Sequence, residues 1–207
     1  MVPGIDVSHF QGIIAWSELA ASEIRFSFIK ATEGAGYVDP KFAANWLGAR
    51  TAGVTRGAYH FFRPAIPAQT QAESFLRTVG TLQPGDLPPV LDLEAPAAWS
   101  QLAVADRVAR VIAWLETVEK RSGATPIVYL SPSFAGEVLK NAPSLARFPL
   151  WLAHHTDNGA PELVEPWTSW TFWQHSPNGR AAGVTGSVDL DQFNGTLEGL
   201  KALTVKA

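Results

Sequence analysis

The feature that most constrains the fold is an alternation, repeated along the 207 residues, between short apolar runs and longer segments of helical spacing. Short apolar runs are typical of buried strands, and a single apolar stripe is typical of a surface helix. The expected strands are Gly4–Val7, Phe26–Lys30, Gly57–Phe61, Pro89–Leu93, Pro126–Leu130, Leu150–Ala153, Thr171–Gln174 and Val188–Asp191. The expected helices are Pro40–Ala52, Ala68–Val79, Gln101–Arg121 and Ser133–Lys140. Strands that alternate with helices predict a parallel sheet with helical crossovers.

The alternation is regular only over the first five strands. The later connections are rich in Pro, Gly and Asn, and they leave little room for crossover helices. These features predict an α/β fold, namely an irregular TIM-like barrel with about five βα units followed by a mostly β remainder. A doubly wound open sheet is the alternative, although no G-x-G-x-x-G motif follows the first strand.

The composition is that of a soluble globular protein, with 46% hydrophobic and 17% charged residues. A formal net charge of −3 without a basic block argues against a nucleic-acid partner. The absence of cysteine excludes disulfides, thiol nucleophiles and Cys-x-x-Cys metal sites. No apolar run is long enough to span a membrane, and the first residues lack the features of a signal peptide. We therefore expect synthesis in the cytoplasm, no membrane association and a monomer.

Four acidic residues fall at the ends of, or within, expected strands. Asp6 ends the first strand, Asp92 and Glu94 end the fourth, and Asp189 lies in the last. In a parallel barrel the C-terminal ends of the strands open on one face, where active sites are built. The four carboxylates are therefore expected to converge on one pocket.

The Asp92-Leu93-Glu94 triplet indicates the chemistry. Residues two apart in a strand point to the same side and are separated by about 6.5 Å along it, so Leu93 should turn into the core. Two neighbouring carboxylates raise one pKa, and the protonated carboxyl can then donate to a leaving oxygen. Glycosidic cleavage needs such an acid and a second carboxylate. The alternative is that these acids are merely solvated or salt-bridged at strand ends.

The sequence resembles glycoside hydrolase family 25, the lysozymes that include many phage endolysins. The matching segments are Gly4-Ile-Asp-Val-Ser8 with Phe10-Gln-Gly12, Phe28-Ile-Lys-Ala-Thr-Glu-Gly34 with Tyr37-Val-Asp-Pro40, Gly57-Ala-Tyr-His-Phe-Phe-Arg-Pro64, Leu91-Asp-Leu-Glu94, Pro126-Ile-Val-Tyr129, Leu150-Trp-Leu-Ala153, Phe172-Trp-Gln-His-Ser176 and Val188-Asp-Leu-Asp-Gln-Phe193. They follow the family order and cover nearly the whole chain.

The resemblance implies an irregular β/α barrel that hydrolyses the β-1,4 bond between N-acetylmuramic acid and N-acetylglucosamine. It implies that Glu94 is the general acid and that Asp92 orients or polarises the 2-acetamido group of the substrate. Asp6 and Asp189 match two further acids of the pocket. Whether the acetamido group, a carboxylate or water attacks the sugar stays open. His155 and Asp191 depart from the family pattern, which usually has an aromatic hydroxyl and an asparagine at these positions.

Eight further side chains are candidates for substrate binding. They are Tyr129, Tyr59, Phe61, Arg63, Lys30, Glu33, Gln174 and Trp151. Aromatic faces stack on sugar rings and charged groups contact polar substituents, but core packing or a mutual ion pair would explain the same residues. His9 and His60 are expected near the mouth of the pocket, where they could tune the acids. No His-x-x-x-His pair is present, so we expect no metal and no cofactor.

The sequence is thus interpreted as a single catalytic domain over residues 1–207, without a separate wall-binding domain. The expected partner is the glycan strand of bacterial peptidoglycan, reached at the cell wall after export or release. Two alternatives are a hydrolase of chitin-like N-acetylglucosamine polymers and a non-catalytic glycan-binding module.

Overall fold

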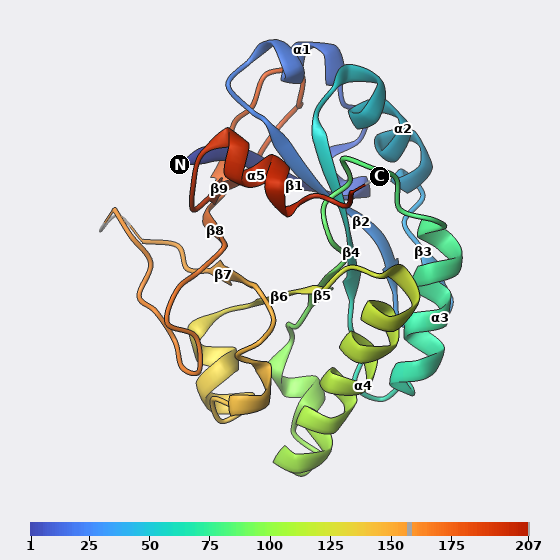
Figure 1. Cartoon of the computed structure of the whole chain (residues 1–207), viewed down its shortest axis with the longest axis vertical. Helices are drawn as coiled ribbons and strands as arrows, with labels where there is room; N and C mark the ends of the chain where they lie inside the picture. The colour runs from blue at the N-terminus through green and yellow to red at the C-terminus, as the bar shows by residue number, and fades with distance from the viewer. Residues whose placement is uncertain (157–158, 207) are drawn as a thin grey trace.

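A closed ring of strands forms the centre of the computed structural model, which describes residues 1–156 and 159–206 (Figure 1). The strands are β1 (Val2–Val7), β2 (Phe26–Glu33), β3 (Tyr37–Val38), β4 (Thr55–Phe61), β5 (Val90–Asp92), β6 (Ile127–Leu130), β7 (Leu150–Ala153), β8 (Phe172–Gly179) and β9 (Val188–Phe193). The helices are α1 (Trp16–Ala21), α2 (Phe42–Ala52), α3 (Ala68–Val79), α4 (Val104–Ser122) and α5 (Leu197–Leu203). Short helical turns are η1 (His9–Gln11), η2 (Pro96–Trp99), η3 (Phe134–Val138) and η4 (Pro143–Leu145).

The ring runs β1-β2-β4-β5-β6-β7-β8-β9 and returns to β1, and β3 pairs with β2 outside it. Neighbours from β1 to β8 are parallel, whereas β9 is antiparallel to both β8 and β1. This arrangement confirms the irregular TIM-like barrel. The open-sheet alternative is wrong because the pairings of β1 with β2 and β9 leave the ring without free edges.

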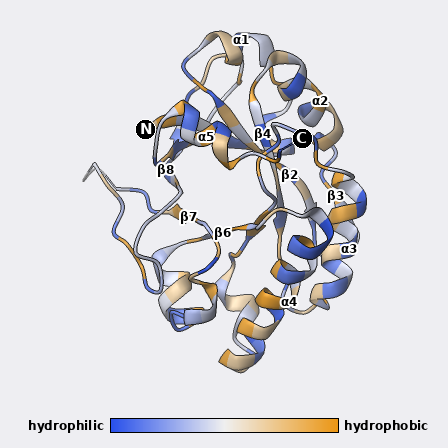
Figure 2. Ribbon diagram, viewed as in Figure 1, coloured by the Kyte–Doolittle hydropathy of each residue, from blue (hydrophilic) through white to orange (hydrophobic). Residues whose placement is uncertain are grey.

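The helices cover one side of the barrel. Figure 1 shows α2, α3 and α4 together along the side formed by β2 and β4, while the chain around β7 and β8 is largely loop. Both α3 and α4 combine hydrophilic and hydrophobic residues (Figure 2). The faces turned inward carry the buried side chains Ala72 and Phe75 on α3, and Val111, Trp114 and Leu115 on α4. This side matches the regular βα part that the sequence predicts.

Three local predictions differ from the structure. The helix expected at Ser133–Lys140 is a single wide turn over Phe134–Val138, and Lys140 and Asn141 then take positive φ values that end any helix. The helix expected from Gln101 begins at Val104. The short elements α1, β3 and α5 were not predicted, because segments of two to seven residues carry too few periodic positions.

The interior of the barrel is filled by large aromatic side chains. Phe26, Phe28 and Phe172 contact one another with ring centroids 4.9 to 5.7 Å apart. Gly4 and Gly57 make this packing possible, since a Cβ atom at either position would approach a phenylalanine ring to 2.3 or 2.6 Å. The barrel is therefore plugged at its base, and any cavity must lie toward the C-terminal ends of the parallel strands.

No helix within residues 1–156 and 159–206 is both long and apolar enough to cross a membrane.

Candidate active site

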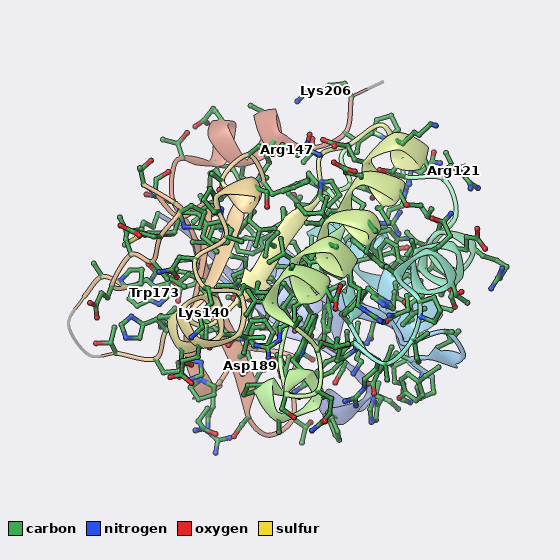
Figure 3. The ribbon with its side chains drawn as sticks, turned by 90° about the horizontal axis from the view of Figure 1, so that it is seen from below. Arg121, Lys140, Arg147, Trp173, Asp189 and Lys206 are labelled. Carbon is green, nitrogen blue, oxygen red and sulfur yellow. The ribbon has the colours of Figure 1, made fainter. Side chains whose placement is uncertain are left out.

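The four predicted acids meet at the C-terminal mouth of the barrel. Asp6 and Asp189 are direct partners in the pairing of β1 with β9, and Asp92 ends β5. Because β9 runs antiparallel, Asp189 near its start lies at the same end as the C-terminal ends of the other strands. Figure 3 labels Asp189 among the side chains. Glu94 follows Asp92 by two residues, and Leu93 between them is fully buried, as the triplet predicted.

All four acids line one hollow of about 350 Å³. Its wall consists of Asp6, Ser8, Phe10, Gln11, Lys30, Tyr59, Phe61, Asp92, Glu94, Tyr129, Trp151, His155, Gln174 and Asp189. A second hollow of about 330 Å³ shares Glu94, Tyr129 and His155 with the first. It is lined by Leu93, Glu94, Ala95, Pro96, Tyr129, Ser131, Ser133, Phe134, Glu137, Ala153 and His155. Glu94 thus stands where two sugar-sized spaces join.

The acids differ in their contact with water. Asp6 and Asp92 are buried, Asp189 is half-buried, and Glu94 is exposed at the mouth. Burial, reinforced by the negative charge of Asp189, raises the pKa of Asp6 well above its ordinary value. Burial and the charge of Glu94 do the same to the pKa of Asp92, although Lys30 opposes the shift. The cluster therefore holds its protons to a higher pH than exposed carboxylates do.

The pKa values of Asp189 and Glu94 are also raised. Partial burial, followed by the charge of Glu94, raises the pKa of Asp189 to about 6. The walls of the two hollows remove part of the hydration of Glu94, which raises its pKa even though Lys30 and Arg63 oppose the shift. A carboxyl in such an environment can remain protonated while staying accessible to a substrate oxygen.

A hydrogen-bond network holds Asp6 in place. The amide of Gln174 donates from Nε2 to Oδ2 of Asp6 at 2.7 Å, and its Oε1 accepts from the hydroxyl of Tyr129 at 2.9 Å. Nε2 of His155 lies 3.1 Å from the same Oε1. Asp92 is different, because its Oδ1 is buried without a hydrogen-bond partner in the part of the chain that the structure describes. An unpaired buried acceptor is costly, so this oxygen is suited to receive a donor from a ligand.

Most of the predicted substrate-binding residues line the first hollow. They are Tyr129, Tyr59, Phe61, Lys30, Gln174 and Trp151. Trp151 is only 2% exposed and packs on Phe28 and Tyr129, while its Nε1 donates to Asp191 at 2.9 Å. It therefore forms the floor of the hollow rather than an open stacking face.

Glu33 and Arg63 do not line either hollow. Glu33 accepts from Nζ of Lys30 at 2.8 Å and from Nε of Arg63 at 2.9 Å. Partial burial alone would raise the pKa of Glu33, but the bonds from Lys30 and Arg63 hold this pKa below its ordinary value. Both cations also lie over the ring of Phe61, with Lys30 at 4.9 Å and Arg63 at 4.6 Å. The cluster fixes Lys30 beside the acids.

The placement expected for His60 was wrong. His60 is fully buried on the helix side of β4, where it stacks on Trp114 and bonds to Thr32 and Gln71. Burial lowers its pKa to about 4, so it stays neutral and belongs to the core. The alternation of side chains along β4 explains this placement, because His60 points to the opposite face of the strand from Tyr59.

Several wall residues were not nominated from the sequence. Ser8, Phe10 and Gln11 follow β1, and Ser131 and Phe134 follow β6. The rule that loops after barrel strands build the site could have found them, since each segment directly follows an expected strand. Among the described residues, no three His, Asp or Glu side chains are grouped so as to hold a metal ion.

The fold agrees with comparisons to known proteins. The profile of Glycosyl hydrolases family 25 matches residues 5–184, and this chain belongs to that family. Lysozyme M1 of Streptomyces globisporus is 37% identical over 210 residues, which cover 98% of this chain and 71% of that protein. The N,O-diacetylmuramidase of Chalaropsis is 32% identical and covers 98% of both chains. The crystal structure of the Streptomyces coelicolor lysozyme superposes with a TM-score of 0.94 at 37% identity, covering 98% of this chain and 96% of that one.

Proposed function

We propose that this protein is a muramidase, which hydrolyses the β-1,4 bond between N-acetylmuramic acid and N-acetylglucosamine in bacterial peptidoglycan. The observation that carries the proposal is the position of Glu94, shared by two hollows and beside three further acids. A glycan that occupies both hollows would place the bond between two sugars next to this carboxyl. The relatives named lysozyme and N,O-diacetylmuramidase support the same substrate class.

In the proposed reaction Glu94 donates its proton to the glycosidic oxygen as the C1–O bond breaks. Positive charge then develops on the sugar in the first hollow, where the acid cluster stabilises it. The unpaired Oδ1 of Asp92 is suited to accept the N–H of the 2-acetamido group, whose carbonyl oxygen attacks C1. Glu94, now a carboxylate, takes a proton from the water that opens this intermediate. Direct attack by a carboxylate or by water is the alternative route.

The test compares wild type with Glu94→Gln on purified peptidoglycan. Turbidity clearing should fall by about 10²- to 10⁴-fold in the variant, the usual contribution of a general acid. Mass analysis of the products should find N-acetylmuramic acid at the new reducing ends. Full activity of Glu94→Gln would contradict the proposal, and so would N-acetylglucosamine at the new reducing ends.

Substrate preference is the second part of the test. A chitin-like polymer lacks the lactyl group of muramic acid, so equal or faster cleavage of chitin would favour the chitinase alternative. Binding of peptidoglycan without any product would favour a non-catalytic module.

We further propose that residues 1–207 act as one catalytic domain, as a monomer, at the bacterial cell wall. The family supports a wall glycan as substrate. Size-exclusion chromatography with light scattering would test the monomer.

A further inference from the structure

Exposed aromatic side chains gather at one edge of the first hollow, at positions that the reaction above does not use. Phe10 is 81% exposed and Tyr37 is 39% exposed. The ring of His9 lies between them, with centroids 4.1 Å from Phe10 and 6.3 Å from Tyr37. We call His9, Phe10 and Tyr37 the rim aromatics. An exposed apolar side chain that also lines a binding hollow indicates a contact surface.

The rim aromatics are held firmly by their neighbours. The turn η1 has a capping box in which the hydroxyl of Ser8 accepts from the backbone of Phe10 and the side chain of Gln11 accepts from the backbone of Ser8. The buried carboxylate of Asp39 accepts from the backbone N–H of His9 at 3.0 Å and lies 2.8 Å from its Nδ1. The hydroxyl of Tyr37 is 3.2 Å from the same Nδ1. The rings are thus preorganised, which lowers the entropic cost of binding.

The barrel order places these rings opposite the second hollow. Around the ring of strands, β6 is four positions from β1 in either direction. The second hollow is built by the segments that follow β5, β6 and β7, with β6 in the middle, whereas His9 and Phe10 lie in the segment that follows β1. Glu94 lines both hollows. A glycan strand that fills the second hollow and passes Glu94 and the three other acids therefore leaves the mouth of the barrel over Phe10.

We propose that the rim aromatics, with Phe10 foremost, form a stacking platform for a sugar of the same glycan strand beyond the sugar held among the acids. This inference rests on the proposed function. The C–H face of a pyranose ring is apolar and flat, and an exposed aromatic ring binds such a face.

The charges beside the platform favour a neutral sugar over the peptide stem of peptidoglycan. The carboxylate of Asp39 is engaged by His9, and the ammonium of Lys30 is engaged by Glu33. Neither is free to pair with an ionised peptide. A ring without charge therefore fits this edge best.

The experiment measures steady-state kinetics of Phe10→Ala and Phe10→Trp on glycan strands stripped of their peptides by an amidase. An aromatic stacking contact of about 0.5–1.5 kcal/mol corresponds to a change of about 2- to 12-fold. Phe10→Ala should raise KM by that factor with kcat little changed, because the contact is made equally in ground and transition states. Phe10→Trp should restore the wild-type KM.

The matched control is Leu47→Ala, which removes an apolar side chain that is 66% exposed on α2 and lines neither hollow. Its KM should equal that of wild type. On the shortest oligosaccharide that wild type cleaves, Phe10→Ala should raise KM by a smaller factor than on the stripped strands, because the distant sugar is absent. The proposed function is tested separately from the platform, because wild type should cleave the strands and Glu94→Gln should not.

Two results would overturn the platform while leaving the enzyme intact. One is an unchanged KM for Phe10→Ala on the stripped strands. The other is a rise in KM only on peptidoglycan that retains its peptides, which would assign the platform to the peptide stem.

Discussion

Asp189→Asn should stabilise the protein at neutral pH while weakening its catalysis. Asp189 is forced into a half-buried cluster of like charges, which raises its pKa to about 6. The same carboxyl in the unfolded chain has a pKa of about 3.9. Between these values the native state holds a proton that the unfolded state has released. The stability of wild type therefore falls as pH rises from about 4 to about 6.

The magnitude follows from the difference between the two pKa values. About two units correspond to about 3 kcal/mol at pH 7, at about 1.4 kcal/mol per unit. Asp189 is only half-buried, so solvent screening reduces this to about 1–2 kcal/mol. Asparagine carries no charge at any of these pH values and removes the penalty. For a chain of this size the expected rise in Tm at pH 7 is about 2–8 °C.

The assay is urea unfolding of wild type and Asp189→Asn at intervals from pH 4 to pH 7.5. The gain in free energy of unfolding should be greatest at pH 7 and should shrink as the pH falls toward 4, where the native carboxyl is protonated and the unfolded one is about half protonated. Loss of turbidity clearing should accompany the gain. A variant that is no more stable than wild type at pH 7, or whose advantage does not depend on pH, would refute the reasoning.

Two further substitutions probe other parts of the structure. Arg56→Met should lower the free energy of unfolding, measured in urea, by about 3–5 kcal/mol. The reason is that Asp86 stays buried but loses the hydrogen bonds from Nε of Arg56 at 2.7 Å and from Nη2 at 3.2 Å. A decrease of less than about 1 kcal/mol would contradict this. Gln174→Met removes the donor to Asp6 and should raise the pKa of that carboxyl further, shifting the acidic limb of the pH–activity profile upward and costing about 1–3 kcal/mol of stability. An unmoved acidic limb would show that Asp6 does not titrate in the reaction.

Local sequence patterns predicted the strands of the barrel and the long helices but missed α1, β3 and α5. The strand Leu150–Ala153 and the helix Ala68–Val79 have the expected bounds, because continuous apolar runs and long stripes are intrinsic to the residues that form them. The turn after β6 was predicted as a helix, since its composition permits one. The left-handed backbone at Lys140 and Asn141 is set by the packing of the turn and cannot be seen in residue types.

The sequence by itself predicted that four carboxylates would meet, since each acid lies in or next to an expected strand and the strand ends share one face of a barrel. It could not say how those groups behave. Burial raises the pKa values of Asp6 and Asp92, leaves one oxygen of Asp92 without a hydrogen-bond partner among the described residues, and turns His60 into a core residue. Only the tertiary structure decides these properties, because hydration and electrostatic coupling depend on which groups surround a side chain in space, and those groups come from strands far apart in the chain.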